Sequence, residues 1–130
     1  MGSLRIFIAC AEEKLRLALL FLLDQSPELV VAGLADRYSG LLTQLEGAQP
    51  EVLLLDWELS TEPMIDLLKD IHNLEHQPKV IVFSTNPQKK EAVLAAGADF
   101  FICKDAPPDL LLPMLNEIRQ SKTDKQTMDE

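Results

Sequence analysis

The segment Pro-Glu-Val-Leu-Leu-Leu-Asp at residues 50–56 carries an unbroken apolar run, residues 52–55, that ends in Asp56. A strand with one face in water alternates apolar and polar residues, whereas a strand of a parallel sheet is covered on both faces and is apolar throughout. The segment therefore predicts an inner strand of a parallel sheet, with a carboxylate at the carboxyl end of that strand.

Strand-like and helix-like patterns alternate on both sides of this segment. Apolar and β-branched runs predict further strands at 4–10, 29–35, 79–83 and 99–103. Apolar residues at helical spacing predict helices at 12–24, 39–48, from about 63, at 87–96 and from 107 or 108. Five strand–helix units in strict alternation predict an α/β fold, a doubly wound parallel sheet with helices on both faces and right-handed crossovers.

Length and charge exclude several function classes. The 130 residues fit one domain, assigned to 1–120, and the polar residues 121–130 are expected to form a frayed tail or the start of a linker. A formal charge of −9 argues against direct binding of nucleic acid or an anionic membrane surface, which need a cationic face. No apolar run approaches the ~20 residues of a membrane span. Two cysteines at unrelated positions favour a reducing, cytoplasmic location.

Chemistry in such a sheet gathers beyond the carboxyl ends of the strands. The residues at those ends are Cys10 and Ala11, Asp56, Ser84 and Thr85, and Lys104. Asp56 could act as a nucleophile, a metal ligand or a helix cap, and Ser84 and Lys104 also have ordinary roles as a turn cap and a solvated cation. An acid, a hydroxyl and a lysine that converge at one edge could together hold a phosphoryl group.

Four segments of the chain resemble the receiver domains of two-component response regulators, especially the subclass that carries a LuxR- or NarL-type DNA-binding domain after the receiver. The resemblance covers about residues 4–120, and its segments are 5–9, 50–56, 80–84 and 95–107. The last is the most specific, with Ala-Gly-Ala-Asp at 96–99 and Lys-Asp-Ala-Pro at 104–107. The resemblance implies a flavodoxin-like (CheY-like) three-layer fold with its five strands in the order 2-1-3-4-5.

The resemblance also implies roles for the strand-end residues. Asp56 matches the aspartate that accepts phosphate from a partner histidine kinase, and Ser84 matches the hydroxyl that moves to bind the phosphoryl group. Lys104 matches the lysine that contacts this group, and Phe101 matches the switch aromatic whose rotamer follows activation. These roles describe a signalling module and not an enzyme. Neither a Gly-rich phosphate loop nor a Gly-x-Ser-x-Gly elbow supports another small α/β function.

One departure from the family concerns its metal site, where an acidic pair at the end of the first strand holds Mg²⁺. In this chain the two positions are Cys10 and Ala11. An alignment that placed Glu12 and Glu13 there instead would shift the next helix by two residues and turn its apolar face by about 200°. Mg²⁺ prefers oxygen ligands, so only Asp56 and a carbonyl near Glu58 remain. We expect weak Mg²⁺ binding, none in the purified protein, and impaired phosphorylation, unless Glu12 or Glu58 substitutes.

A second departure is apolar surface on the first and last helices. Leu17, Leu20 and Phe21 lie close together on the first helix, and Leu112 thickens the apolar stripe of the last. They form either the margin of a broad core or a protein–protein patch that supports a homodimer. The competing hypothesis for the whole chain is accordingly a phosphorylation-independent pseudo-receiver, an interaction or dimerisation module.

Overall fold

Five parallel strands form a sheet in the computed structural model, which describes residues 2–59, 63–106 and 108–128. In spatial order the strands are β2 (Leu29–Ala35), β1 (Leu4–Ala9), β3 (Val52–Asp56), β4 (Lys79–Ser84) and β5 (Phe100–Cys103). All neighbouring strands pair in parallel. The order 2-1-3-4-5, which the resemblance implied, is confirmed.

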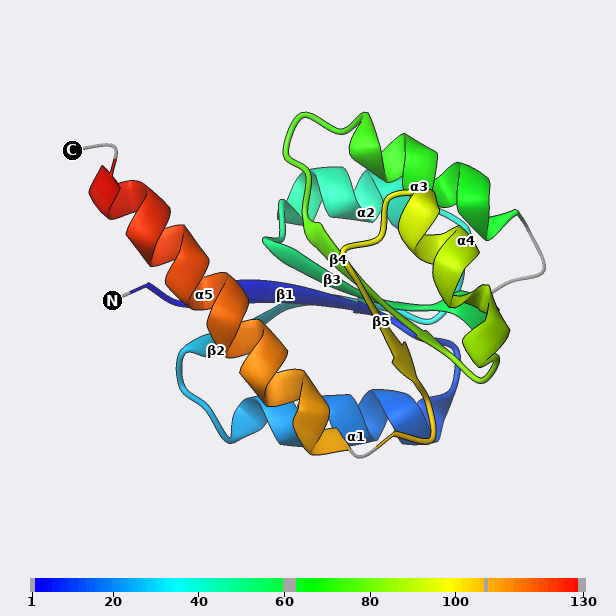
Figure 1. The fold of residues 1–130 in the computed structure, drawn as a ribbon, viewed down its shortest axis with the longest axis horizontal. Coiled ribbons are helices and arrows are strands. Elements are labelled where there is room, and N and C mark those ends of the chain that lie inside the picture. The colour runs from blue at the N-terminus through cyan, green and yellow to red at the C-terminus, as the bar shows by residue number, and fades with distance from the viewer. Residues whose placement is uncertain (1, 60–62, 107, 129–130) are drawn as a thin grey trace.

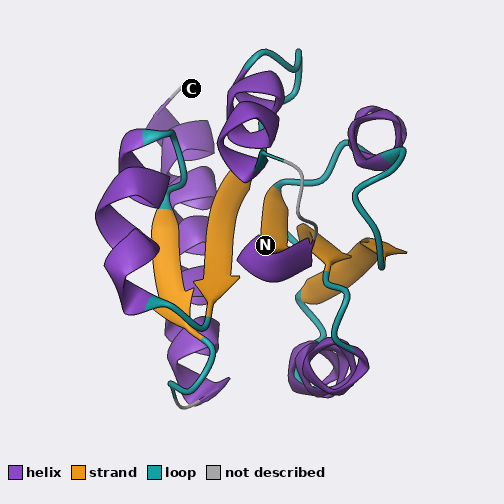
Figure 2. Ribbon diagram, turned by 90° about the vertical axis from the view of Figure 1, so that its right-hand side faces the viewer, coloured by secondary structure: helices purple, strands orange, loops and turns teal. Residues whose placement is uncertain are grey.

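Helices cover both faces of this sheet, as Figures 1 and 2 show. One face carries α1 (Glu13–Asp24) and α5 (Leu111–Met128), and the other carries α2 (Leu41–Ala48), α3 (Met64–His72) and α4 (Lys90–Ala95). Short 3₁₀ turns lie at Trp57–Leu59, Pro87–Lys89 and Pro108–Leu110. The predicted three-layer α/β/α architecture is therefore confirmed.

The central strands are apolar throughout because successive side chains enter two different cores. From β3, Leu53 and Leu55 pack against α2, α3 and α4, whereas Val52 and Leu54 pack against α1 and α5. All four are at most 1% exposed. This double coverage is the physical basis of the unbroken apolar run at 52–55, and β3 ends at Asp56.

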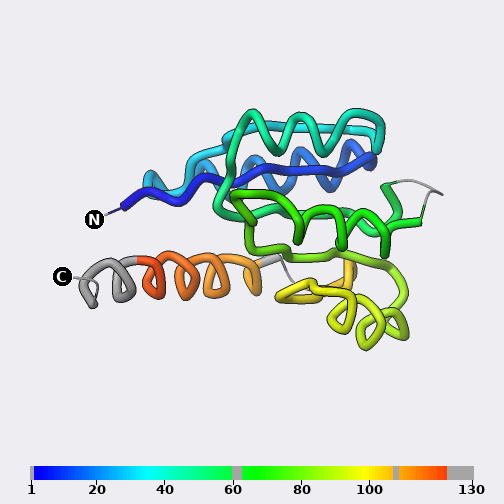
Figure 3. The backbone as a smooth tube through the Cα atoms, turned by 90° about the horizontal axis from the view of Figure 1, so that it is seen from above, coloured from blue at the N-terminus to red at the C-terminus, as the bar shows by residue number. Residues whose placement is uncertain are grey.

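The last helix extends past residue 120, where the domain is predicted to end. Residues 121–130 are expected to form a frayed tail or the start of a linker, and the structure shows residues 121–128 as a continuation of α5 rather than frayed. No Gly or Pro interrupts 121–128, and Lys122 pairs with Glu51 and donates to the Ser3 carbonyl at 3.1 Å. Figure 3 shows that α5 runs toward the side of the molecule where β1 begins. In the part of the chain that the structure describes, no helix has the length and apolarity to cross a membrane.

Candidate functional site

Asp56 ends β3 in a closed environment, with its side chain only 2% exposed. Its Oδ1 accepts bonds from the Lys104 ammonium at 2.7 Å and the Glu58 N–H at 2.9 Å. Its Oδ2 accepts a bond from the Ala11 N–H at 3.3 Å and lies 3.6 Å from the Cys10 thiol sulfur. Both oxygens are thus engaged by groups of the chain itself, which orients the carboxylate rigidly at the sheet edge.

Lys104 directly follows β5, and its ammonium group forms ion pairs with three carboxylates. Its Nζ lies 2.7 Å from Asp56 Oδ1, 3.2 Å from Glu58 Oε1 and 3.6 Å from Glu12 Oε2. Burial by itself would lower the pKa of this ammonium, but the bonds and charges of Asp56 and Glu58 outweigh burial and raise the pKa above its ordinary value. Lys104 is therefore a firmly protonated cation at the centre of an acidic group.

Glu58 is the residue whose contacts sequence reasoning missed. Its Oε2 accepts the Ser84 hydroxyl at 2.8 Å, and its Oε1 accepts the Thr85 N–H at 3.0 Å and the Thr85 hydroxyl at 3.2 Å. Burial would raise the pKa of Glu58, but these donors and Lys104 outweigh it and hold the pKa below its ordinary value of 4.5. The sequence feature that could have indicated these contacts is the position of Glu58, two residues after the aspartate at the end of a strand.

Cys10 and Ala11 lie beside Asp56 but supply no charge. Burial, and then the negative charge of Asp56, raise the pKa of the Cys10 thiol to about 11, so it is protonated at neutral pH. The Ala11 side chain is exposed and only its N–H reaches Asp56. Arg16 Nη1 fixes this segment by donating to the Cys10 carbonyl at 2.8 Å. The residues at the end of β1 therefore border the Asp56 carboxylate with uncharged groups.

The structure therefore brings together most of the strand-end residues that the sequence singled out. Asp56, Ser84 and Lys104 join one network, and both Glu12 and Glu58 reach Lys104. Among the described residues, no group of three or more His, Cys, Asp and Glu side chains is arranged to hold a metal ion. The acidic side chains near Asp56 converge on an ammonium group instead.

The remaining predicted residues lie away from this network. Phe101 is half-buried on β5, pairs with Val82 of β4 and packs against the core under α2, α3 and α4. On the α1 surface Leu17 is 56% exposed and Phe21 is 72% exposed. The other two interface candidates, Leu20 and Leu112, are half-buried and pack against the core under α1 and α5. The structure thus divides the four residues between core margin and free surface.

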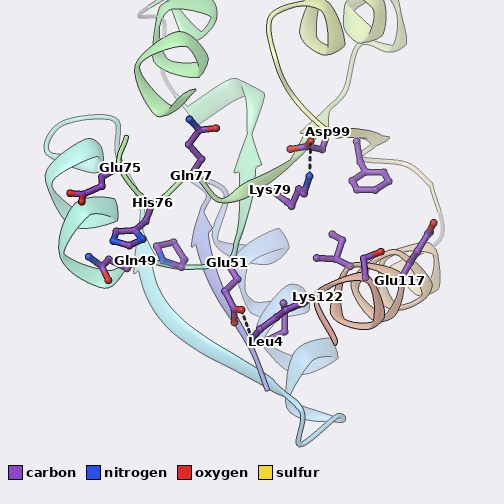
Figure 4. Close-up of a pocket in the computed structure, with 14 residues that line it drawn as sticks. Leu4, Gln49, Glu51, Glu75, His76, Gln77, Lys79, Asp99, Glu117 and Lys122 are labelled. Atoms are coloured by element: carbon purple, nitrogen blue, oxygen red, sulfur yellow. Dashed lines mark ion pairs between the residues drawn. The ribbon is translucent and has the colours of Figure 1, made fainter. Parts of the chain in front are cut away.

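A groove lies at the opposite edge of the sheet, where the strands begin (Figure 4). Its lining includes Glu51 paired with Lys122, and Lys79 paired with Asp99 at 3.8 Å. None of its lining residues belongs to the Asp56 network. The chemistry of the strand ends and this groove are therefore separate features.

Comparison with curated proteins finds relatives among response regulators. The nitrate/nitrite response regulator protein NarL of Escherichia coli (strain K12) is 26% identical over 98 residues, which cover 74% of this chain and 45% of NarL. A nitrate/nitrite response regulator protein homolog of Haemophilus influenzae is 26% identical over 95 residues, covering 72% of this chain and 45% of that protein. The chain thus spans less than half the length of these relatives.

Solved structures share the fold. The isolated REC domain of RcsB from Salmonella enterica serovar Typhimurium, determined with the phosphomimetic BeF3−, superposes with a TM-score of 0.82 at 21% identity, covering 92% of this chain and 90% of that one. The response regulator domain of Thermotoga maritima CheB has a TM-score of 0.74 at 23% identity, covering 91% and 95%. At these identities the similarity establishes the fold alone.

A family model identifies the chain directly. Residues 6–116 match the model described as the response regulator receiver domain. The match extends from β1 into α5 and includes every residue of the Asp56 network. The chain therefore belongs to the response regulator receiver domain family of two-component systems.

Proposed function

We propose that Asp56 is the phosphoacceptor of this receiver domain and that its Mg²⁺-dependent phosphorylation is impaired. The observation that carries the proposal is the environment of the Asp56 carboxylate, which has the Lys104 ammonium on one oxygen and the neutral Cys10 thiol near the other. The ammonium suits an acceptor of a phosphoryl group, whereas the thiol stands where the family has a metal-binding carboxylate. The proposed partner is a histidine kinase or another signalling protein.

The proposed reaction is phosphoryl transfer from a phosphohistidine. A carboxylate oxygen of Asp56 attacks phosphorus, and the new P–O bond forms as the P–N bond breaks. The electron pair of the P–N bond stays on the ring nitrogen, which takes one proton from solvent, so that the histidine leaves as neutral imidazole. Lys104 lies 2.7 Å from Asp56 and would offset the charge of the phosphoryl oxygens, and the Ser84 hydroxyl would bind one of them. Phe101 would change rotamer as Ser84 moves, which transmits the signal to the protein surface.

The donor set does not fit Mg²⁺ well. This cation requires oxygen ligands in near-octahedral geometry, and position 10 supplies a thiol that stays protonated at neutral pH. Glu12 and Glu58 are the available acidic substitutes, but both of their carboxylates already lie against Lys104. A cation entering this group would have to compete with a resident ammonium, which supports the proposal of weak binding.

Titration with Mg²⁺ and acetyl phosphate, followed by intact-protein mass spectrometry, tests this function. We expect that only a fraction of the wild-type molecules gain a phosphoryl group, one per molecule, and that no molecule of Asp56→Asn does. The matched control is Asp66→Asn, which removes an exposed carboxylate at the start of α3 and should behave as the wild type does. Stoichiometric, Asp56-dependent modification at ordinary Mg²⁺ concentrations would refute the impairment, and modification that survives in Asp56→Asn would refute the acceptor.

The second candidate function is a pseudo-receiver that acts through protein contacts without phosphate. The exposed pair Leu17 and Phe21, four residues apart on one face of α1, is the observation that favours it. If the pair mediates homodimerisation, sedimentation velocity should show concentration-dependent association that Leu17→Ser with Phe21→Ser abolishes. A clean monomer at high concentration would count against self-association.

The setting we propose follows from charge and family. A signalling module of charge −9 acts through proteins and not through direct contact with nucleic acid or membrane. Its free thiols, buried Cys10 and half-buried Cys103, fit a reducing cytoplasm. DNA binding, where a longer protein carries it, would belong to a separate domain.

A further inference from the structure

The Glu58 carboxylate is surrounded by donors in the way that a bound anion would be. Four donors converge on it: the Ser84 hydroxyl, the N–H and hydroxyl of Thr85, and the Lys104 ammonium, all between 2.8 and 3.2 Å. They come from the carboxyl ends of β4 and β5, and Glu58 itself lies in the turn after β3. A single carboxylate therefore joins three strand ends.

These donors overlap with those that phosphorylated Asp56 requires. This inference rests on the proposed function, in which the phosphoryl group on Asp56 would accept hydrogen bonds from the Ser84 hydroxyl and the Lys104 ammonium. A hydroxyl has one proton to donate, so Ser84 serves either Glu58 or a phosphoryl oxygen but not both. Lys104 donates at hydrogen-bond distance to Asp56 at 2.7 Å and to Glu58 at 3.2 Å, and Glu12 at 3.6 Å adds a third negative charge, so a phosphoryl oxygen would compete with Glu58 for this ammonium.

We propose that the Glu58 carboxylate acts as an internal substitute for the phosphoryl group, holding Ser84, Thr85 and Lys104 in a ligand-bound arrangement that phosphorylation of Asp56 would have to displace. The turn thereby has a dual effect. It presets the switch residue Ser84 in the absence of phosphate, and it competes with phosphate for the same donors. Both effects come from the side chain of one residue.

Displacement of Glu58 is physically accessible. Its side chain is 39% exposed, so the carboxylate can rotate into water without opening the core. Its backbone N–H stays on Asp56 Oδ1 at 2.9 Å, so the turn itself need not move. Bonds from charged groups are worth more than neutral ones, and the competition is therefore strong enough to measure.

The test compares Glu58→Ala and Glu58→Gln with the wild type in two separate measurements. The matched control is Glu46→Ala, which removes an exposed carboxylate from α2. In the first measurement, without phosphate or metal, NMR follows the Thr85 amide and the Phe101 ring. We expect the Thr85 amide proton to move upfield and exchange faster in Glu58→Ala, to change less in Glu58→Gln, and to stay in place in Glu46→Ala. An unmoved Thr85 amide in Glu58→Ala would overturn the inference.

The second measurement titrates each protein with beryllofluoride at fixed Mg²⁺, with ¹⁹F NMR and Trp57 fluorescence as readouts. We expect Glu58→Ala to bind the analogue about tenfold more tightly than the wild type, because no internal anion competes. Equal or weaker binding in Glu58→Ala would overturn the competition. The two measurements also separate this inference from the proposed function: beryllofluoride binding that survives in Asp56→Asn would refute Asp56 as the acceptor, whereas the Glu58 arrangement is decided by the Thr85 amide alone.

Discussion

Replacement of Lys104 by methionine is expected to lower the free energy of unfolding by about 3 kcal/mol. The reason is the state in which the substitution leaves Asp56. This carboxylate is 2% exposed and its shortest contact is the Lys104 ammonium at 2.7 Å. Removal of one partner from a buried ion pair leaves a charge that neither water nor an opposite charge stabilises.

The neighbouring carboxylates increase this cost. Glu12 and Glu58 also pair with Lys104, so the substitution leaves three negative groups near one another without a cation. Chemical denaturation with guanidinium measures the loss at neutral pH. The matched control is Lys79→Met, which breaks an exposed pair with Asp99 at 3.8 Å and should cost less than about 1 kcal/mol.

A double substitution separates the ion pair from the packing of the lysine stem. Adding Asp56→Asn to Lys104→Met removes the stranded buried charge, so we expect the double variant to recover more than half of the lost stability. If the double variant is no more stable than Lys104→Met alone, the loss comes from packing and the account of the buried charge is wrong.

The same groups determine how stability depends on alkaline pH. The folded-state pKa of Lys104 lies above its ordinary value of 10.5, so its contribution is full below 10.5 and is lost as the pH rises through the folded pKa. Cys10 acts in the same direction, because its thiol ionises near 9.0 when unfolded and at about 11 when folded. Lys104→Met removes the first contribution and keeps the second, so its loss of stability relative to the wild type should shrink at high pH.

The fold could be predicted from the sequence because its determinants are local patterns. The run at 52–55 is apolar at every position because Leu53 and Leu55 face one core and Leu54 faces the other, and this marks an inner parallel strand. The meeting of Asp56 and Lys104 followed from topology, since the carboxyl ends of parallel strands lie at one edge. The helical end of α5 was missed because polar residues without Gly or Pro fit both a tail and a helix.

The bonds made by Glu58 could not be predicted in the same way. They depend on a 3₁₀ turn and on one side-chain rotamer, neither of which leaves a periodic signal in the sequence. The sequence left open whether Leu20 and Leu112 lie at the margin of the core or in a protein–protein patch, because the answer depends on how α1 and α5 lie on the sheet and not on their own apolar spacing. These side-chain contacts therefore required the structure, whereas the five strands, most of the helical segments and the meeting of Asp56 with Lys104 did not.

Placing an acidic pair at positions 10 and 11 is expected to create a working metal site. Cys10→Asp with Ala11→Asp places two carboxylates at the end of β1, and the Cys10 sulfur already lies 3.6 Å from Asp56 Oδ2. Mg²⁺ binds carboxylate oxygens, so we expect the double variant to bind it at least about tenfold more tightly than the wild type, a difference of about 1.4 kcal/mol. Trp57 fluorescence and isothermal calorimetry measure the affinity.

Stability provides an independent measure of this metal site. Without metal the added carboxylates repel Asp56, so the double variant should unfold at a lower temperature than the wild type. A ligand that binds only the folded state stabilises it by RT ln(1 + [L]/Kd), or about 2.7 kcal/mol at a hundredfold excess over Kd. We therefore expect the melting temperature of the variant, and much less that of the wild type, to rise with Mg²⁺.

The control for this gain is Cys10→Ser with Ala11→Ser, which changes the same two positions and adds oxygen without charge. We expect its affinity for Mg²⁺ to exceed that of the wild type by at most about threefold, because a hydroxyl carries no net charge to attract the cation. Equal gains in Mg²⁺ affinity in the serine and aspartate variants would mean that Mg²⁺ binding by the wild type is not limited by a lack of negative charge at these positions. A gain confined to the aspartate variant, accompanied by faster acetyl phosphate uptake at Asp56, would support the proposal that uncharged side chains at positions 10 and 11 impair the phosphorylation of this receiver.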